Sequence, residues 1–337
     1  MRASVLHGVE DLRFEEVDDP EPGPGEIALR PAHNGICGSD LHMYYATGPV
    51  APTVLGHEFA GTVTALGEGV TDLAVGTRIA VRPIDACGHC QQCAAGNTHR
   101  CFPPRFIGCN VAGGGLAERS VVPRVTAFPL PETVSLELGA LVEPMAVSFN
   151  GIVQSRIEAG GTAVVLGGGP IGIGVLLGLR AIGVTDTVVV EPSTVRRDVV
   201  DRLGAADVLD PTTDDVAAVI RARTAGRGAD AVFECAGVAN AFNTALSIVT
   251  PGGRVVIVAL YEEPVTFSPF PLITGELEVV GSMAYAPGVF ERVVDLMAAG
   301  HYATDGWVEH IAWDDIVGEG FTPLRQGRRA KVLVDVT

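Results

Sequence analysis

The segment AVVLGGGPIG, residues Ala163–Gly172, decides the fold class of the second half of the chain. Its four apolar residues predict a buried strand, and Gly167, Gly169 and Gly172 satisfy the pattern G-x-G-x-x-G. In this pattern the first glycine allows a tight turn, the second lets the backbone approach a pyrophosphate, and the third permits close packing of helix on strand. Pro170 and Ile171 complete the turn and begin an apolar, helix-like segment. The segment therefore predicts a dinucleotide-binding turn.

An acidic residue follows this turn at the expected distance. Glu191 ends the apolar segment Thr187–Val190, nineteen residues past Gly172. An acid roughly 20 residues past the turn typically hydrogen-bonds the adenosine ribose of NAD. Because a carboxylate there repels the 2′-phosphate of NADP, the sequence favours NAD. Arg196 and Arg197 follow closely and could neutralise such a phosphate, so NADP stays as the alternative and Arg196 as a candidate cofactor contact.

Strand-length apolar segments alternate with helix-length segments from about residue 160 onward. This alternation predicts a doubly wound parallel sheet, the Rossmann arrangement, over residues 146–284. The six predicted strands are Ala163–Leu166, Thr187–Val190, Asp207–Leu209, Ala231–Glu234, Arg254–Val258 and Glu278–Val280.

The flanking parts of the chain have a different texture. Short β-branched runs at Glu26–Leu29, Gly61–Thr64 and Arg78–Val81 are separated by Gly, Pro and Asp residues, and the chain ends in the strand-like Lys331–Val334. Such runs are typical of a β-rich domain. We therefore expect an α/β protein whose Rossmann domain is inserted into a second domain formed by residues 1–145 and 285–337.

Composition excludes several classes of protein. The 337 residues carry a net charge of −17, and 47% of them are hydrophobic. A nucleic-acid-binding protein needs a basic surface to displace counterions from phosphates, which this charge argues against. No apolar run of about 18 residues is free of glycine, proline or charge, and the N-terminus lacks a signal-peptide core. We expect a cytoplasmic protein with no membrane or nucleic-acid partner.

Four of the seven cysteines lie within fifteen residues. They follow the pattern C-x2-C-x2-C-x7-C and are Cys87, Cys90, Cys93 and Cys101. Four thiolates at these intervals can form a closed tetrahedral zinc site, which leaves no position for a substrate and is therefore structural. The nearby His89 and His99 are expected on the surface. Cys109 and Cys235 are expected to be small buried residues rather than ligands.

Further candidate ligands are scattered through the first domain. The segment NGICGSDLH, Asn34–His42, contains a thiol, a hydroxyl, a carboxylate and an imidazole. His57 and Glu58 are adjacent, and Glu143 precedes Pro144. Each residue alone has an ordinary explanation, such as a buried cysteine, a core histidine or a surface glutamate. Spacing by itself does not join them into one site.

The order of these motifs resembles the zinc-containing medium-chain dehydrogenase/reductase family. The resemblance covers nearly the whole chain and rests on C-G-S-D-x-H, G-H-E, the four-cysteine segment, E-P and G-x-G-x-x-G, in this order. Glutamate rather than cysteine at position 143 resembles the polyol branch, which includes sorbitol and 2,3-butanediol dehydrogenases. The resemblance implies a GroES-like, partly open barrel for the β-rich domain.

The resemblance also implies roles for individual residues. Cys37 and His57 would bind a catalytic zinc, together with Glu143 or Glu58, which cannot be ranked. Asp40 would orient His57 through its free ring nitrogen. The proton relay would consist of Ser39 and His42. The pyrophosphate of the cofactor would be contacted by Lys331, with Arg328 and Arg329 as alternatives.

These roles imply a zinc-dependent oxidoreductase with one catalytic and one structural zinc per chain. It would transfer a hydride between a secondary alcohol, vicinal diol or polyol and NAD through a zinc-bound alkoxide. Family members are usually homodimers or homotetramers. The alternatives are a threonine or simple secondary-alcohol dehydrogenase, a zinc-free quinone or enone reductase, and a non-catalytic nucleotide-binding protein of the same fold. Intact Ser39 and His42 argue against the last, because a binding protein needs no proton relay.

Overall fold

The computed structural model describes residues 1–49 and 52–336, which fold as two units. Unit 1 comprises Met1–Pro144, Ala286–Ala299 and Trp307–Thr337, and unit 2 comprises Met145–Tyr285 and Gly300–Gly306. The main boundaries lie one residue from the expected ones at 145/146 and 284/285. In addition, the short segment Gly300–Gly306 returns to unit 2. In that return, the guanidinium of Arg202 donates a hydrogen bond to the carbonyl of Gly306 at 3.2 Å.

Unit 2 is built on a six-stranded sheet in the order β11-β10-β9-β12-β13-β14, in which every neighbouring pair is parallel. This confirms the predicted doubly wound sheet, since the strand order reverses at β9. The strands are β9 (Thr162–Leu166), β10 (Asp186–Val190), β11 (Asp207–Leu209), β12 (Ala229–Glu234), β13 (Val249–Ile257) and β14 (Glu278–Gly281).

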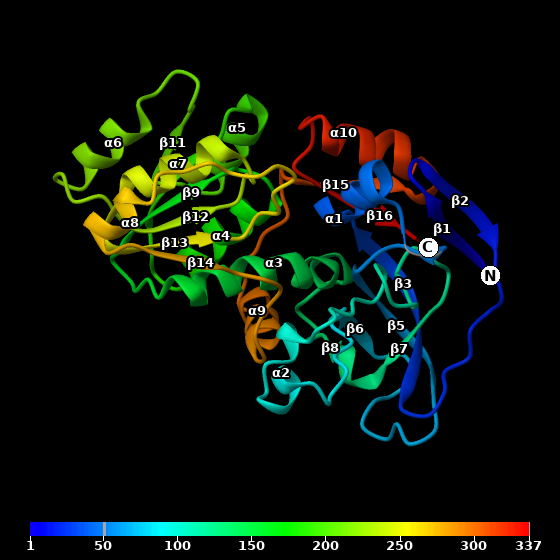
Figure 1. Ribbon diagram of the computed structural model, residues 1–337. Coiled ribbons are helices and arrows are strands. Elements are labelled where there is room, and N and C mark those ends of the chain that lie inside the picture. Colours follow the sequence, from blue (N-terminus) through cyan, green and yellow to red (C-terminus); the bar gives the residue numbers. More distant parts are fainter. Residues whose placement is uncertain (50–51, 337) are drawn as a thin grey trace. The chain divides into compact units, whose positions relative to one another are not determined.

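Helices cover both faces of this sheet (Figure 1). On one face, Ile220, Phe242 and Leu246 share a buried cluster with Val164 and Val232 of the central strands. The continuous apolar runs of these strands reflect burial on both faces. The helices of this part of the chain are α3 (Leu136–Ser155), α4 (Pro170–Ala181), α5 (Thr194–Arg202), α6 (Val216–Arg223), α7 (Ala239–Ile248) and α8 (Phe270–Gly275).

Helix α3 begins in unit 1 and continues into unit 2. Within the described residues it is long and apolar enough to span a membrane, but 72% of its most apolar window is buried inside the protein. A buried core helix has the same composition as a membrane span. Its apolar character is therefore explained by the fold.

Unit 1 contains two sheets. In the larger one, the order is β15-β16-β3-β5-β6-β8, with β7 also paired to β3, and the smaller one has the order β2-β1-β4. All pairs are antiparallel except β15 with β16. The strands are β1 (Arg2–Gly8), β2 (Asp11–Glu16), β3 (Glu26–Gly35), β4 (Thr53–Val54), β5 (Glu58–Leu66), β6 (Arg78–Val81), β7 (Ser120–Pro123), β8 (Ala127–Pro129), β15 (Val308–Ala312) and β16 (Lys331–Asp335).

The helices of unit 1 are short apart from α9. They are α1 (Gly38–His42), α2 (Gln91–Ala94), α9 (Val289–Ala298) and α10 (Thr322–Arg325), with single-turn segments η1 (Met43–Thr47), η2 (Thr98–Arg100), η3 (Arg124–Thr126), η4 (Trp313–Asp315) and η5 (Ile316–Phe321). The first and last parts of the chain meet in one core, because Leu6 and Ile36 pack in the same cluster as Val332 and Val334. The C-terminal strand β16 thereby reaches the end of β3, where the catalytic candidates lie.

Candidate active site and metal centres

Cys37, His57 and Glu58 lie together at the end of strand β3. Cys37 follows β3 and precedes α1, and Glu58 opens β5, where it pairs with Gly35 of β3. One ligand atom from each of the three side chains lies within 4.8 Å of the others. The sheet register therefore joins two motifs that the sequence spacing left separate.

The ring of His57 is oriented by its neighbours. Its Nδ1 lies 3.5 Å from Asp40 Oδ1, and its Nε2 lies 3.4 Å from Ser39 Oγ. Asp40 is itself held in place, because its other carboxylate oxygen accepts a hydrogen bond from the backbone N–H of Cys37 at 2.9 Å. This capping contact of helix α1 puts the carboxylate behind the imidazole, as expected for a residue that orients a histidine ligand.

Cys109 is a site residue that the sequence did not reveal. Its Sγ lies 3.3 Å from His57 Nδ1. We expected Cys109 and Cys235 to be buried, but both are partly exposed. No local motif surrounds Cys109, so only the folded chain identifies it as a neighbour of the site.

Glu58 forms a buried ion pair with Lys331. The Lys331 amino group contacts the Glu58 carboxylate and donates a hydrogen bond to the carbonyl of Ile36 at 2.8 Å. Both side chains are 1% exposed. Gly35 makes room for the pair, since a side chain on this residue would overlap the Glu58 carboxylate.

The expected role of Lys331 is therefore corrected. We expected this lysine to contact the pyrophosphate of the cofactor, but its amino group is buried in unit 1 with two partners. The strand β16 begins at Lys331 and carries the side chain inward beside β3 rather than outward to a ligand. Its charge lies beside the group formed by Cys37, His57 and Glu58.

Glu143 is buried on helix α3, where 7% of it is exposed. Burial raises the pKa of its carboxyl to about 7, with the nearby Glu58 acting in the same direction and His57 and Lys331 opposing it. Glu143 is not in the group of atoms within 4.8 Å, whereas Glu58 is. Its place as a metal ligand stays a prediction.

The donor set of Cys37, His57 and Glu58 fits a zinc ion. Thiolate, imidazole and carboxylate are the ligands that zinc takes in proteins. Burial and the charge of Glu58 raise the pKa of the Cys37 thiol. A buried thiol next to a carboxylate becomes a thiolate readily only when a cation offsets the charge, which a metal at this position would do.

The four cysteines of the second cluster come together as the spacing predicted. The sulfur atoms of Cys87, Cys90, Cys93 and Cys101 all lie within 4.8 Å of one another. Backbone N–H groups of Cys93 and Phe102 lower the pKa of the Cys90 thiol to about 6, whereas burial raises that of Cys93 to about 12. Four adjacent sulfurs cannot all ionise without a cation, and four thiolates match a closed zinc site.

One neighbour of this cluster differs from expectation. His89 is exposed as expected, and its Nδ1 lies 2.8 Å from the carbonyl of Cys87. His99 is buried rather than on the surface. It lies in the single turn η2, which turns it inward directly before Cys101, and burial lowers its pKa.

The glycine turn of unit 2 has the geometry that its motif requires. Gly167 has a φ of +108°, which side chains rarely permit, and its carbonyl lies where a side chain on Gly172 would be. Glu191 is 3% exposed, and its carboxylate accepts a hydrogen bond from the backbone N–H of Gly168 at 2.7 Å. The acid predicted to contact ribose thus lies against the turn predicted to hold pyrophosphate.

The two arginines after Glu191 differ in their surroundings. Arg197 forms an ion pair with Asp210 at 2.9 Å and donates to the carbonyl of Glu191 at the same distance. Arg196 lies beside the turn, 4.0 Å from where a side chain on Gly169 would begin. Arg196 is therefore the arginine nearer to the glycine turn, which is predicted to hold the pyrophosphate.

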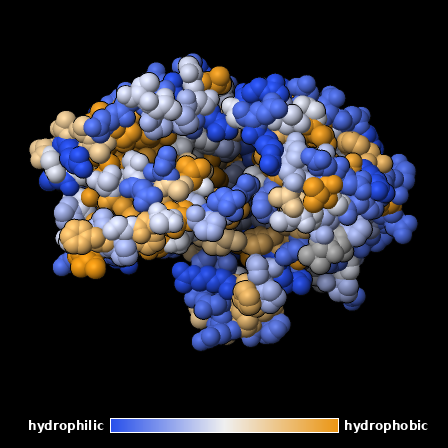
Figure 2. Space-filling model, turned by 45° about the horizontal axis from the view of Figure 1, so that its top comes forward, coloured by the Kyte–Doolittle hydropathy of each residue, from blue (hydrophilic) through white to orange (hydrophobic). Residues whose placement is uncertain are grey.

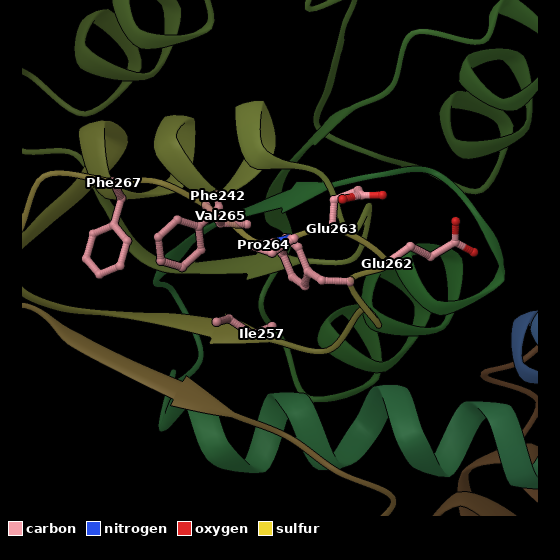
Figure 3. Close-up of a pocket in the computed structure, with 8 residues that line it drawn as sticks. Phe242, Ile257, Glu262, Glu263, Pro264, Val265 and Phe267 are labelled. Carbon is pink, nitrogen blue, oxygen red and sulfur yellow. The ribbon is translucent and has the colours of Figure 1, made fainter. Parts of the chain in front are cut away.

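A separate hollow of about 440 Å³ lies in unit 2 (Figure 3). The rings of Phe242 and Phe267 meet edge to face there, with centroids 5.2 Å apart. Ile257, Pro264 and Val265 complete an apolar lining beside the carboxylates of Glu262 and Glu263. It shares no residue with either candidate metal site.

Two family models match the chain. The model described as alcohol dehydrogenase GroES-like domain matches residues 23–132, and the model described as zinc-binding dehydrogenase matches residues 170–299. The (R,R)-butanediol dehydrogenase of Bacillus subtilis (strain 168) is 37% identical over 351 residues and covers 99% of both chains. The chain belongs to the zinc-containing medium-chain dehydrogenase/reductase family. This dehydrogenase is thus an oxidoreductase with a GroES-like unit and a Rossmann unit.

Other relatives agree. The crystal structure of 2R,3R-butanediol dehydrogenase from B. subtilis has a TM-score of 0.93 at 36% identity, with 99% of both chains covered. A zinc-binding dehydrogenase structure from Sinorhizobium meliloti 1021, bound to NADP, has a TM-score of 0.92 at 35% identity, covering 99% of this chain and 98% of that one. The 2-dehydro-3-deoxy-L-galactonate 5-dehydrogenase of Pseudoalteromonas atlantica is 36% identical, with 92% of both chains covered. The dehydrogenase falls in the polyol branch of its family.

Proposed function

We propose that this dehydrogenase oxidises vicinal diols or polyols with NAD, and reduces the corresponding hydroxyketones in the reverse direction. The observation that carries the proposal is the cluster of Cys37, His57 and Glu58, with ligand atoms within 4.8 Å and both His57 and Glu58 buried. Relatives named as butanediol and sugar-acid dehydrogenases support the substrate class. We further propose one catalytic zinc at this cluster and one structural zinc at the four cysteines.

The residues of the chain itself supply binding, orientation and proton movement. Bound zinc would polarise the substrate oxygen and bound NAD would take up the hydride. Ser39, whose Oγ lies 3.4 Å from His57 Nε2, would accept the hydroxyl proton and pass its own proton on towards His42. His42 lies three residues further along helix α1, on the neighbouring position of the same helix face. A histidine suits the outer end of a relay, because its ordinary pKa of about 6.5 lies near neutral pH.

Two carboxylates distinguish this site from one built on thiolates. Glu58 lies within ligand distance of Cys37 and His57, and Glu143 is buried in the same electrostatic neighbourhood. The buried Glu143 carboxyl offers two further oxygens that can hydrogen-bond a substrate hydroxyl. Such a group suits the second hydroxyl of a vicinal diol. Equal turnover of a diol and its mono-alcohol analogue would remove this argument.

The preference for NAD rests on Glu191. Its buried carboxylate lies at the glycine turn, where it would accept a hydrogen bond from a ribose hydroxyl and repel a 2′-phosphate. Arg196 is the group that favours the alternative, and one similar structure was solved with NADP. A cytoplasmic location stays a prediction from the sequence.

We propose that the dehydrogenase assembles as a homodimer, or a dimer of dimers, through strand β14. This strand ends the parallel sheet of unit 2, and among the described residues its strand partner is β13 alone. Hydrophobic patches are visible on the surface in Figure 2. Exposed apolar side chains near the strand include Leu260, Phe270, Ile273, Val279 and Met283. An unpaired edge with apolar neighbours typically pairs with another chain.

The decisive experiment is a reduction screen with NAD and NADP. The purified, zinc-loaded enzyme is given 2,3-butanediol stereoisomers, longer polyols, threonine and simple secondary alcohols. We expect the highest kcat/KM for a vicinal diol or polyol with NAD. Preference for threonine or for a mono-alcohol would select the alternative functions, and no reduction of either cofactor with any substrate would refute the proposal.

A further inference from the structure

A second group of ligand-type side chains lies in unit 1 outside the catalytic cluster. It contains His33 of β3, His310 of β15 and Asp335 of β16. The Nδ1 atoms of both histidines lie 2.8 Å from the same Asp335 oxygen, Oδ1. The two rings meet at 83° with their centroids 5.3 Å apart. Two imidazoles thus converge on one carboxylate oxygen.

The sheet register fixes this convergence. Strand β16 runs between β3 and β15, with Asp335 opposite His33 and Leu333 opposite His310. The three side chains project from adjacent strands whose backbones are hydrogen-bonded to each other. Little backbone entropy is therefore lost when they act together on one ligand.

A fourth residue has the position of an outer partner. Glu137, in the first turn of helix α3, has its Oε1 3.6 Å from His310 Nε2, the ring nitrogen that faces away from Asp335. Histidines that bind metals usually donate their other ring N–H to a carboxylate, which fixes the tautomer. Here the carboxylate is already in place.

We propose that His33, His310 and Asp335 form a third metal site, which binds one divalent transition-metal ion such as zinc. Three ligands at about 2.1 Å from a tetrahedral zinc lie roughly 3.4 Å apart, so the nitrogens and Asp335 Oδ1 need to separate only slightly from 2.8 Å. Each imidazole then binds the metal through Nδ1 and keeps its proton on Nε2. In His310 this Nε2–H donates a hydrogen bond to Glu137. Two imidazoles select zinc, nickel or copper over magnesium and calcium.

The side chains are partly exposed, which suits a metal that exchanges with solvent. His33, His310 and Asp335 have 26%, 36% and 40% of their side chains accessible. Water can therefore occupy the fourth position. The site would join the strand that precedes Cys37 to the strand that begins with Lys331, and so brace the framework of the catalytic cluster. It does not depend on the substrate or cofactor proposed above.

The test counts zinc in the complete enzyme. Wild-type protein and the variants His33→Gln and His310→Gln are dialysed against excess zinc, and bound metal per chain is measured by mass spectrometry. We expect wild type to hold about one zinc more than either variant. His7→Gln is the matched control, because His7 pairs with a single carboxylate, that of Glu15, at 2.9 Å and should keep the wild-type count. Glu137→Gln should lower the affinity of this third site for zinc by about tenfold.

A second measurement needs no variant. Histidines of the wild-type enzyme are labelled with diethyl pyrocarbonate with and without excess zinc, and modified residues are identified by mass spectrometry. We expect excess zinc to protect His33 and His310 and leave His7 reactive. Equal zinc counts in wild type and both variants, or equal labelling of His33 and His310 with and without zinc, would overturn the proposal. If wild-type protein bound fewer than two zinc ions besides the one lost in the histidine variants, that count would instead contradict the proposed catalytic and structural sites.

Discussion

The contribution of the buried ion pair between Glu58 and Lys331 to stability can be measured by removing one charge or both. Lys331→Met keeps the length and apolar stem of the side chain but removes its charge and its hydrogen bond to Ile36. Glu58 then loses its cationic partner in a position that is 1% exposed. The double variant Glu58→Gln/Lys331→Met removes both charges and leaves neutral groups of similar size.

The two variants should differ strongly in stability. Removing one partner of a buried pair typically lowers the free energy of unfolding by about 3–5 kcal/mol, because the other charge is left without compensation. Replacing both partners is often nearly neutral. We therefore expect Lys331→Met to lose about 3–5 kcal/mol and the double variant to recover most of it. Arg119→Met, which breaks the pairs with the exposed carboxylates of Asp19 and Glu21, is the control and should cost less than about 1 kcal/mol.

Intrinsic fluorescence is a suitable assay because both tryptophans, Trp307 and Trp313, are buried in unit 1 with the ion pair. Urea unfolding of zinc-stripped protein then reports on this unit. With a slope of up to about 3 kcal/mol per molar urea, the midpoint of Lys331→Met should fall by roughly 1–2 M. If Glu58 is a zinc ligand, zinc loading should reduce this deficit, since the metal compensates the carboxylate.

Either of two results would show that Lys331 does not stabilise the protein by compensating the charge of Glu58. An unchanged midpoint for zinc-stripped Lys331→Met would mean that the lysine does not compensate a buried charge. A double variant as unstable as Lys331→Met would show that the packing of the lysine stem, rather than the charge of Glu58, sets the cost. A zinc-independent deficit would favour Glu143 as the acidic ligand.

Three other predictions follow from the sites. Asp40→Asn should weaken retention of the catalytic zinc against a competing chelator by about 10–100-fold, since the amide orients His57 less strongly, while the four-cysteine zinc should be unaffected. Cys93→Ser should remove one zinc per chain and leave diol oxidation measurable. In wild-type protein stripped of zinc by a chelator, Cys90 should react with iodoacetamide above a pH of about 6, before Cys93 does. Simultaneous labelling of the two cysteines would contradict this order of their pKa values. Glu191→Ser should raise the ratio of kcat/KM for NADP to that for NAD by about tenfold or more, because like-charge contacts cost several kcal/mol; an unchanged ratio would show that Glu191 does not select the cofactor.

Local patterns in the sequence predicted much of this protein. The six strands of unit 2 lie where alternating apolar segments indicated, and their parallel order follows from the intervening helices. The glycine turn and the four-cysteine cluster are short segments whose geometry depends on near neighbours. His99 shows the limit of this reasoning, because a single turn of η2 decides whether a polar residue faces water.

The sequence alone determined the two-unit α/β architecture, the dinucleotide turn and the four-cysteine cluster, since each depends on residues that are close along the chain. It supplied Cys37, His57 and Glu58 as candidates but could not join them. Tertiary structure decided that Lys331 contacts Glu58 across 273 residues of sequence, that Cys109 lies beside His57, and that two histidines meet at Asp335. These contacts depend on which strands pair and in which register, and burial then fixes which charges must compensate each other.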